Sequence, residues 1–202
     1  MKIVEIFTSL QGEGISSGYP TIFIRLAGCN LSCSYCDTPA SRIGGEELSV
    51  PEVCDRVIQE KPAYICITGG EPLLQSAEVA LLAERLSAGG KRVSIETNGT
   101  MPFETVLPHA SVCMDVKCPS SGEKSDLTLL HALRPLDSVK FVVGTGEDLA
   151  YAEDIIRRYP IQAEVFISPV YGTDYQLVAS YILIHNLPAR MQLQLHKFIG
   201  IP

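Results

Sequence analysis

Three closely spaced cysteines are the part of this sequence best suited to chemistry. Cys29, Cys33 and Cys36 follow an apolar run over residues 21–27 and have the spacing C-x3-C-x2-C. Iron-sulfur cubanes are normally held by four thiolates, so three close cysteines leave one iron open to another ligand. A catalytic metal centre keeps such an open position. The spacing predicts a catalytic [4Fe–4S] cluster, with a structural zinc site or buried, unliganded thiols as the alternatives.

A glycine-rich motif after the next apolar run suggests a ligand for the open iron. The segment Thr68-Gly69-Gly70-Glu71-Pro72 lets the backbone approach a ligand closely, and Glu71 supplies an acceptor for a bound amino group. The sulfonium cofactor S-adenosylmethionine (SAM) carries such an amino group and can bind iron through it and its carboxylate. The alternative is an ordinary glycine turn in which Pro72 opens a helix.

The other four cysteines are expected to pack in the core. Cys54 falls in a predicted helix, Cys66 and Cys113 fall in apolar strands, and none has a second cysteine at ligand spacing. Cys118 ends a strand and is the one that could approach the site. An odd total of seven cysteines is typical of a reducing compartment, where thiols serve metals or catalysis rather than disulfides.

Short apolar, β-branched runs alternate with amphipathic stretches along the chain, which predicts repeated βα units. The expected strands cover residues 4–8, 21–27, 63–68, 92–96, 112–116, 139–143, 163–168 and 191–195. The expected helices run from a Ser49/Glu52 capping box to about residue 60, along the stripe 79/82/83/86, and over 147–159 and 174–186. Parallel strands with helical crossovers coil toward a barrel, but 202 residues are short for eight units. We expect an α/β fold, an open partial barrel of about six βα units with its site at the carboxyl ends of the strands.

The amino-acid composition and net charge indicate which kinds of partner the protein can bind. With 46% hydrophobic and 19% charged residues, residues 1–202 can form a single domain. The net charge of −7 argues against nucleic acid or an anionic membrane as the partner, since both require clustered Lys and Arg. Glu5 interrupts any signal-peptide apolar region, and no stretch reaches the length of a membrane span, so we expect a cytoplasmic protein that binds a small molecule or another protein.

The cysteine spacing and the Gly-Gly-Glu-Pro turn together resemble the radical SAM superfamily. Five further segments are similar to the 7-carboxy-7-deazaguanine synthase family, and they span the chain from end to end. They are Leu10-Gln11-Gly12-Glu13-Gly14, Arg25, Cys36-Asp37-Thr38, Asp115-Val116-Lys117-Cys118-Pro119-Ser120 and Gly200-Ile201-Pro202.

This resemblance implies a radical SAM lyase of deazapurine and queuosine biosynthesis. It would contract the ring of 6-carboxy-5,6,7,8-tetrahydropterin to 7-carboxy-7-deazaguanine with loss of ammonia, using a [4Fe–4S] cluster, SAM and Mg2+. A 5'-deoxyadenosyl radical would take hydrogen from C6 of the pterin and later be regenerated. The resemblance further implies a homodimer, a reducing electron donor of flavodoxin-like kind, and a radical SAM core domain with a substrate-binding N-terminal loop and C-terminal tail.

The resemblance also assigns roles to residues. Thr38 matches the Mg2+ ligand, and the terminal carboxylate of Pro202 matches a pterin contact. The other substrate contacts would be Leu10, Gln11, Gly12, Glu13, Arg25 and Thr68. The SAM contacts would be Ser34, Tyr35, Cys36, Gly70, Glu71, Cys118, Pro119, Ser120, Ser168, Pro169, Val170 and Tyr171.

Two other functions share part of these features. A glycyl-radical-enzyme activase would have the cysteines and the Gly-Gly-Glu-Pro turn but would act on a protein, and the Gln11 loop and Pro202 count against it. A non-catalytic iron-sulfur electron carrier would explain the cysteines but not residues 68–72 or the barrel pattern.

Overall fold

One curved, mixed sheet organises the protein. The computed structural model describes all 202 residues, and its nine strands lie in the order β3-β1-β2-β4-β5-β6-β7-β8-β9. From β2 to β9 every neighbouring pair is parallel, whereas β1 runs antiparallel to both β2 and β3. The strands are β1 (Lys2–Leu10), β2 (Pro20–Leu26), β3 (Glu46–Glu47), β4 (Tyr64–Gly69), β5 (Arg92–Thr97), β6 (Ser111–Val116), β7 (Ser138–Val143), β8 (Glu164–Pro169) and β9 (Arg190–Met191).

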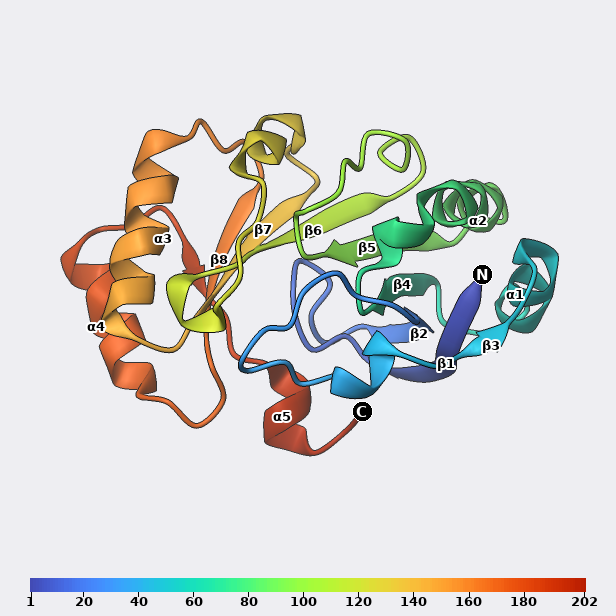
Figure 1. Cartoon of the computed structure of the whole chain (residues 1–202), viewed down its shortest axis with the longest axis horizontal. Coiled ribbons are helices and arrows are strands. Elements are labelled where there is room, and N and C mark those ends of the chain that lie inside the picture. Colours follow the sequence, from blue (N-terminus) through green and yellow to red (C-terminus); the bar gives the residue numbers. More distant parts are fainter.

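Helices cover the outer face of this sheet, and the concave face carries the loops (Figure 1). Of the six crossovers between parallel strands, four contain an α-helix, while β5–β6 has none and β6–β7 has only 3-10 turns. The sheet does not close, because β3 and β9 end it on opposite sides. The expected open partial barrel is confirmed. The helices are α1 (Val50–Val57), α2 (Ser76–Ala88), α3 (Gly146–Arg158), α4 (Tyr175–Ile184) and α5 (Leu195–Ile199), with 3-10 turns η1 (Pro39–Arg42), η2 (Pro72–Gln75), η3 (Pro119–Ser121) and η4 (Leu127–Ala132).

The expected strands and helices are present with shifted boundaries, except near the C-terminus, and β3 and α5 were not expected. The predicted capping box is present, since the Ser49 hydroxyl accepts the Glu52 N–H and the Glu52 carboxylate accepts the Ser49 N–H at 2.8 Å. The predicted strand over 191–195 is wrong: β9 ends at Met191, and Leu195 begins α5. Polar and apolar residues alternate over 191–195 because Gln192 and Gln194 bind the loop after β1, not because this segment is a strand.

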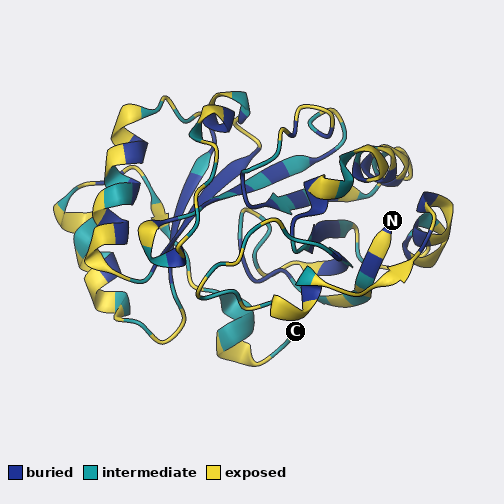
Figure 2. Ribbon diagram, viewed as in Figure 1, coloured by how far each residue is buried: buried dark blue, intermediate teal, exposed yellow.

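The core lies between the helices and the strands (Figure 2). Strand β7 is buried along its whole length, as parallel strands covered on both faces are. One of its buried residues is Lys140, a charged side chain that requires partners at that depth. No helix is long and apolar enough to cross a membrane.

A buried carboxylate joins the amino ends of β6 and β7. Asp137 is fully buried, and its oxygens accept hydrogen bonds from the Val112 N–H at 2.8 Å and from the Arg134 N–H and guanidinium at 2.8–2.9 Å. The same guanidinium donates to the Ala110 carbonyl at 2.7 Å. Asp137 therefore satisfies several donors at once in a site from which water is excluded.

We expect Asp137→Asn to lower the free energy of unfolding by about 2 to 4 kcal/mol, because it leaves buried donors and a guanidinium without an anionic partner. Urea unfolding followed by circular dichroism measures the change. Asp154→Asn is the control, since that carboxylate pairs with Arg158 on the surface of α3 and should contribute little. Equal losses in the two variants would contradict the role given to Asp137.

Candidate active site

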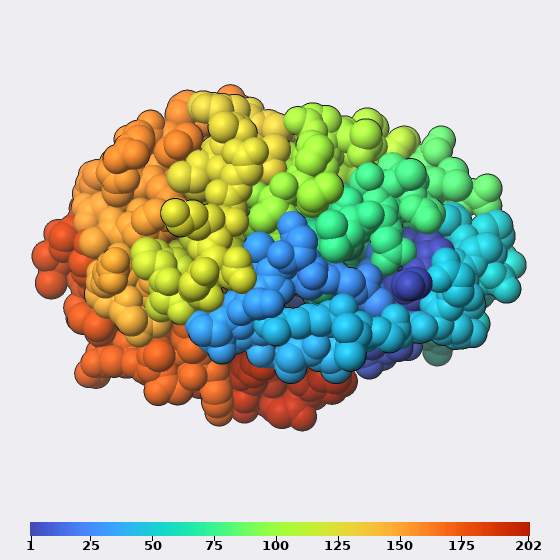
Figure 3. Space-filling model, in the orientation of Figure 1, coloured from blue at the N-terminus to red at the C-terminus, as the bar shows by residue number.

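A cavity of about 560 Å³ opens at the carboxyl edge of the parallel strands. It lies between the sheet, the loop of residues 27–38, the β1–β2 loop and the C-terminal segment. Figure 3 shows the loop after β2 spread over the front of the molecule beside the C-terminal segment. The residues lining the cavity include Leu10, Gln11, Gly12, Glu13, Arg25, Cys29, Cys33, Tyr35, Cys36, Asp37, Thr38, Thr68, Gly70, Glu96, Asn98, Cys113, Asp115, Lys117, Lys140, Val170, Tyr171, His196, Lys197 and Pro202.

All three predicted cluster ligands line this one cavity. The thiols of Cys29, Cys33 and Cys36 are free and partly exposed, and burial raises the pKa of the Cys33 thiol. No group of three or more His, Cys, Asp or Glu side chains converges to hold a single metal ion. A polynuclear cluster is bound by thiolates spaced around it, so its ligands need not meet at one point. The donor set of three accessible thiols around one cavity fits a cluster with an open iron.

The loop that carries these cysteines is held by the strand ends beneath it. The Glu71 N–H donates to the Gly28 carbonyl at 2.7 Å, and the Ser34 N–H donates to the Ser121 carbonyl at 3.0 Å. A Cβ on Gly70 would lie 2.1 Å from the Gly28 oxygen and 2.8 Å from the Cys29 Cβ. Only glycine lets the β4 turn approach the cysteine loop this closely.

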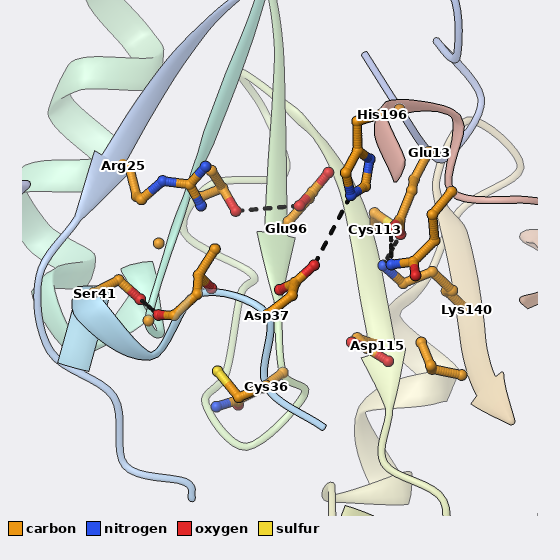
Figure 4. Close-up of a pocket in the computed structure, with 18 of the residues that line it drawn as sticks. Glu13, Arg25, Cys36, Asp37, Ser41, Glu96, Cys113, Asp115, Lys140 and His196 are labelled. Carbon is orange, nitrogen blue, oxygen red and sulfur yellow. Dashed lines mark hydrogen bonds and ion pairs between the residues drawn. The ribbon is translucent and has the colours of Figure 1, made fainter. Parts of the chain in front are cut away.

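The cavity also contains a carboxylate that was not among the predicted site residues. Glu96, at the carboxyl end of β5, accepts a hydrogen bond from the Thr68 hydroxyl at 3.1 Å and from the Gln11 amide at 3.4 Å. No cation lies in an ion pair with it. Its position at a strand end, in the sequence Glu96-Thr97-Asn98-Gly99, was the signal available in the sequence. Figure 4 shows it between Arg25 and the C-terminal segment.

On the opposite wall, Lys140 binds Glu13 (Figure 4). Both side chains are nearly fully buried, and Glu13 also accepts a hydrogen bond from the Gln194 amide at 2.7 Å. Although burial opposes ionisation of Glu13, the adjacent ammonium keeps its pKa low. Burial also raises the pKa of the Cys113 thiol to about 12. The sequence predicted Glu13 in the site but did not predict Lys140.

The C-terminal segment supplies basic groups to the same end of the cavity as Glu13. His196 Nε2 and Lys197 Nζ lie 3.9 Å and 3.2 Å from Asp37 Oδ2, and these groups hold the pKa of Asp37 well below its usual range. Thr38, the proposed Mg2+ ligand, follows directly, and its hydroxyl does not cap the η1 turn. His196 and Lys197 were not predicted as site residues, because their place depends on how α5 packs against the β1–β2 loop.

Short contacts fix α5 against the β1–β2 loop. The Leu195 N–H donates to the Gly12 carbonyl at 3.0 Å, and a Cβ on Gly12 would lie 2.1 Å from His196 Nδ1. The Ser9 hydroxyl donates to the main-chain oxygen of Pro202 at 2.9 Å. Pro202 also lines the cavity, and its contact with substrate stays a prediction. A side chain at position 12 would clash with the His196 imidazole, which accounts for glycine there.

Several predicted SAM contacts lie behind the cavity wall rather than on it. Cys118 and Ser168 are fully buried, and the Ser168 hydroxyl has no hydrogen-bond partner. Ser120 donates to the carboxylate of Asp148, which fixes the η3 turn to the start of α3. Val170 and Tyr171 do line the cavity. The predicted contacts that do not line it are Ser34, Glu71, Cys118, Pro119, Ser120, Ser168 and Pro169.

The Glu71 side chain is engaged with protein on every side. It is fully buried, and its carboxylate accepts the Leu73 N–H at 2.8 Å, the Asn98 N–H at 2.7 Å and the Thr97 hydroxyl at 3.0 Å. Burial raises its pKa despite these bonds. The side chain of Asn98 in turn donates to Asn30 at 3.0 Å. The carboxylate thus ties the ends of β4 and β5 together beneath the cysteine loop, a role different from the amino-group acceptor expected from the sequence.

Glu71→Gln should lower the free energy of unfolding by about 1 to 3 kcal/mol, because the amide presents N–H groups to donors that now face an acceptor. Thermal unfolding of the metal-free protein measures this loss without any cofactor. Glu78→Gln on the exposed face of α2 is the matched control. A Glu71→Gln protein as stable as the control would show that these bonds do not hold the strand ends.

Comparison with known proteins shows the family of the chain. Residues 23–110 match the family model described as the Radical SAM superfamily. The chain is 69% identical over 202 residues to 7-carboxy-7-deazaguanine synthase of Methanospirillum hungatei JF-1, which covers all of this chain and 86% of that protein. A protein of the same name from Koribacter versatilis is 39% identical over 221 residues, covering all of this chain and 98% of its own length.

Solved structures show the same architecture. The crystal structure of QueE from Escherichia coli matches with a TM-score of 0.79 at 26% identity, covering 96% of this chain and 94% of that one. Streptococcus suis SuiB bound to S-adenosylmethionine has a TM-score of 0.59 at 11% identity, covering 85% of this chain and 51% of its own, and so shows the fold alone. The whole-chain identities show more: the chain belongs to the 7-carboxy-7-deazaguanine synthase family of the radical SAM superfamily.

Proposed function

We propose that this protein is a radical SAM lyase that converts 6-carboxy-5,6,7,8-tetrahydropterin to 7-carboxy-7-deazaguanine with loss of ammonia, a step of queuosine and related deazapurine biosynthesis. One observation carries the proposal: three free cysteine thiols and a set of polar side chains suited to a pterin line the same cavity. Family membership supports the same reaction.

The cluster and SAM would occupy the part of the cavity beneath the cysteine loop. Cys29, Cys33 and Cys36 would hold the [4Fe–4S] cluster, leaving one iron for SAM. When bound, the cluster supplies the electron that cleaves SAM to the 5'-deoxyadenosyl radical, which takes hydrogen from C6 of the pterin. Gly70 lets the turn after β4 pack against the cysteine loop at the cavity. The remaining SAM contacts would come from Tyr35, Val170 and Tyr171, which line the cavity, while the other predicted contacts lie outside its lining: Ser34, Glu71, Cys118, Pro119, Ser120, Ser168 and Pro169.

The pterin would bind at the polar end of the cavity. Its aminopyrimidinone edge presents N–H donors and acceptors, which Gln11 and Glu13 can match, and the Arg25 guanidinium can bind a carboxylate. Arg25 is pre-oriented, since its Nε donates to Glu5 at 2.7 Å and its guanidinium lies 5.4 Å from the Phe7 ring centroid. Thr68 and Pro202 complete the contacts, and Leu10 and Gly12 contribute backbone.

Thr38 would contribute one oxygen to Mg2+. A lone hydroxyl is a weak ligand, so the substrate carboxylate and water must complete the octahedron. Asp37 precedes it, with a carboxylate kept ionised by His196 and Lys197.

We also propose the compartment, the electron donor and the oligomeric state of the enzyme. The free state of all seven cysteines is compatible with a reducing cytoplasm. A flavodoxin-like or similar donor would supply the electron, and the protein would act as a homodimer, both by analogy with the family.

The deciding experiment measures 7-carboxy-7-deazaguanine and 5'-deoxyadenosine formed by the reduced, anaerobically reconstituted protein, with and without the pterin. Pterin-dependent product supports the proposed reaction. SAM cleavage that does not respond to the pterin would favour a glycyl-radical-enzyme activase, and no cleavage would favour an electron carrier.

Replacing Cys33 by Ala should remove the visible absorbance of the cluster and abolish SAM cleavage, because three thiolates are needed to seat a cubane with one open iron. Iron and sulfide analysis together with the cleavage assay measure both effects. Cys54→Ala on α1 should retain them, since that thiol lies away from the cavity. An intact, active cluster in Cys33→Ala would refute the ligand assignment.

Thr38→Ala should abolish most of the Mg2+ stimulation of turnover while the cluster content stays normal, because the variant removes one hard oxygen ligand. Titrating turnover with Mg2+ measures the effect, and Thr38→Ser, which keeps the hydroxyl, should restore it. A wild-type response to Mg2+ in Thr38→Ala would remove Thr38 from the metal site.

A further inference from the structure

We infer that Lys140 is a positioning residue for substrate specificity, which holds Glu13 as an oriented, ionised acceptor for the N–H edge of the pterin. This inference rests on the proposed function, because it assigns Glu13 a pterin to bind. Lys140 itself would act through Glu13 rather than on the substrate.

The position of Lys140 in the sheet leaves it one strong partner. On β7 it pairs in register with Asp115 of β6 and Phe166 of β8. Asp115 already accepts the Lys117 ammonium at 2.7 Å. The Lys140 ammonium instead binds the carboxylate of Glu13, which comes from the β1–β2 loop. A buried lysine therefore joins the sheet to the β1–β2 loop along one wall of the cavity.

Glu13 is held from two sides. Lys140 binds Oε2, and the Gln194 amide donates to Oε1 at 2.7 Å. Each carboxylate oxygen can accept more than one hydrogen bond, so acceptor capacity remains for a ligand in the cavity. Because both oxygens have fixed partners, the carboxylate has little freedom to rotate. Binding of the pterin would then cost less entropy, because the Glu13 carboxylate is already ordered.

The charges around Glu13 explain why the cation is required. Glu13 lies near Cys113 of β6, and His196 approaches it from α5. Glu96 on β5 and Asp115 on β6 lie around the Lys140 ammonium that binds it. Without Lys140, burial would favour the protonated acid of Glu13. A protonated carboxyl presents an O–H toward the 2-amino and N3–H donors of an aminopyrimidinone. It would reject the edge that the carboxylate accepts.

The test uses Lys140→Met, Glu13→Gln and the double variant, with steady-state kinetics for the pterin and for SAM. Lys140→Met should raise the pterin KM roughly tenfold or more, with kcat and the SAM KM within about twofold of wild type. The Glu13 pKa is raised in this variant, so the ionised fraction grows with pH. The pterin KM should therefore fall as the pH rises between about 6 and 9.

The double-mutant cycle distinguishes a role of Lys140 in positioning Glu13 from direct contact of Lys140 with the substrate. Glu13→Gln should raise the KM without that pH dependence, and adding Lys140→Met to it should raise the KM no further. Any pH dependence that persists in the double variant belongs to His196, Glu96, Asp115 or Cys113, and is subtracted. Lys91→Met is the matched lysine control, because Lys91 Nζ binds the Glu60 and Pro62 carbonyls outside the cavity.

Three results would overturn the inference: an unchanged KM in Lys140→Met, a KM rise that does not depend on pH, or effects of the two substitutions that multiply. If Lys140→Met does not fold, Lys140→Arg and the double variant carry the test. The arginine should keep the wild-type pH profile, and a larger KM rise in Lys140→Arg than in Glu13→Gln would refute the role. If the wild-type and Lys91→Met proteins form no product from the pterin, the proposed function itself fails and the inference falls with it.

Discussion

The contact of the Gly70 backbone with Gly28 determines where the cysteine loop crosses the sheet. Only a residue without a side chain fits there, and the next peptide, at Glu71, donates to the Gly28 carbonyl. The Glu71 carboxylate then joins the end of β5 to the same turn. Three neighbouring strand ends are thereby fixed under one loop. The cavity floor, and with it the position of all three thiols, depends on this contact.

The opposite side of the cavity is built from residues far apart in the sequence. The β1–β2 loop, the middle of β7 and the start of α5 meet through Glu13, Lys140 and Gln194. These polar bonds are buried, so each unmet group would be costly, and the arrangement specifies one geometry. A second set of bonds, between Gln192 and Gly14, closes the same junction. The sheet and the C-terminal segment thus both shape the end of the cavity where the pterin is proposed to bind.

Much of the fold was predictable because parallel strands buried on both faces produce continuous apolar runs, and because capping residues such as Ser49 mark helix starts locally. The cysteine loop and the glycine turn were equally predictable from spacing. Lys140 and His196 were not, because their roles depend on which strands and loops face one another across the cavity. Residues 191–195 were wrongly predicted as a strand for a related reason, since their alternating glutamines form hydrogen bonds with a loop far away in the sequence. The cofactor and substrate roles of the predicted site residues remain predictions.

The two edges of the sheet have a consequence for assembly. Both are formed by strands of two residues, and one of these, β3, consists of two glutamates. The glutamates of β3 oppose addition of a further strand beside them. β3 pairs only with Lys2 and Ile3, however, so the rest of β1 keeps an unpaired backbone edge, at which another chain could extend the sheet without changing the strand order that forms the cavity.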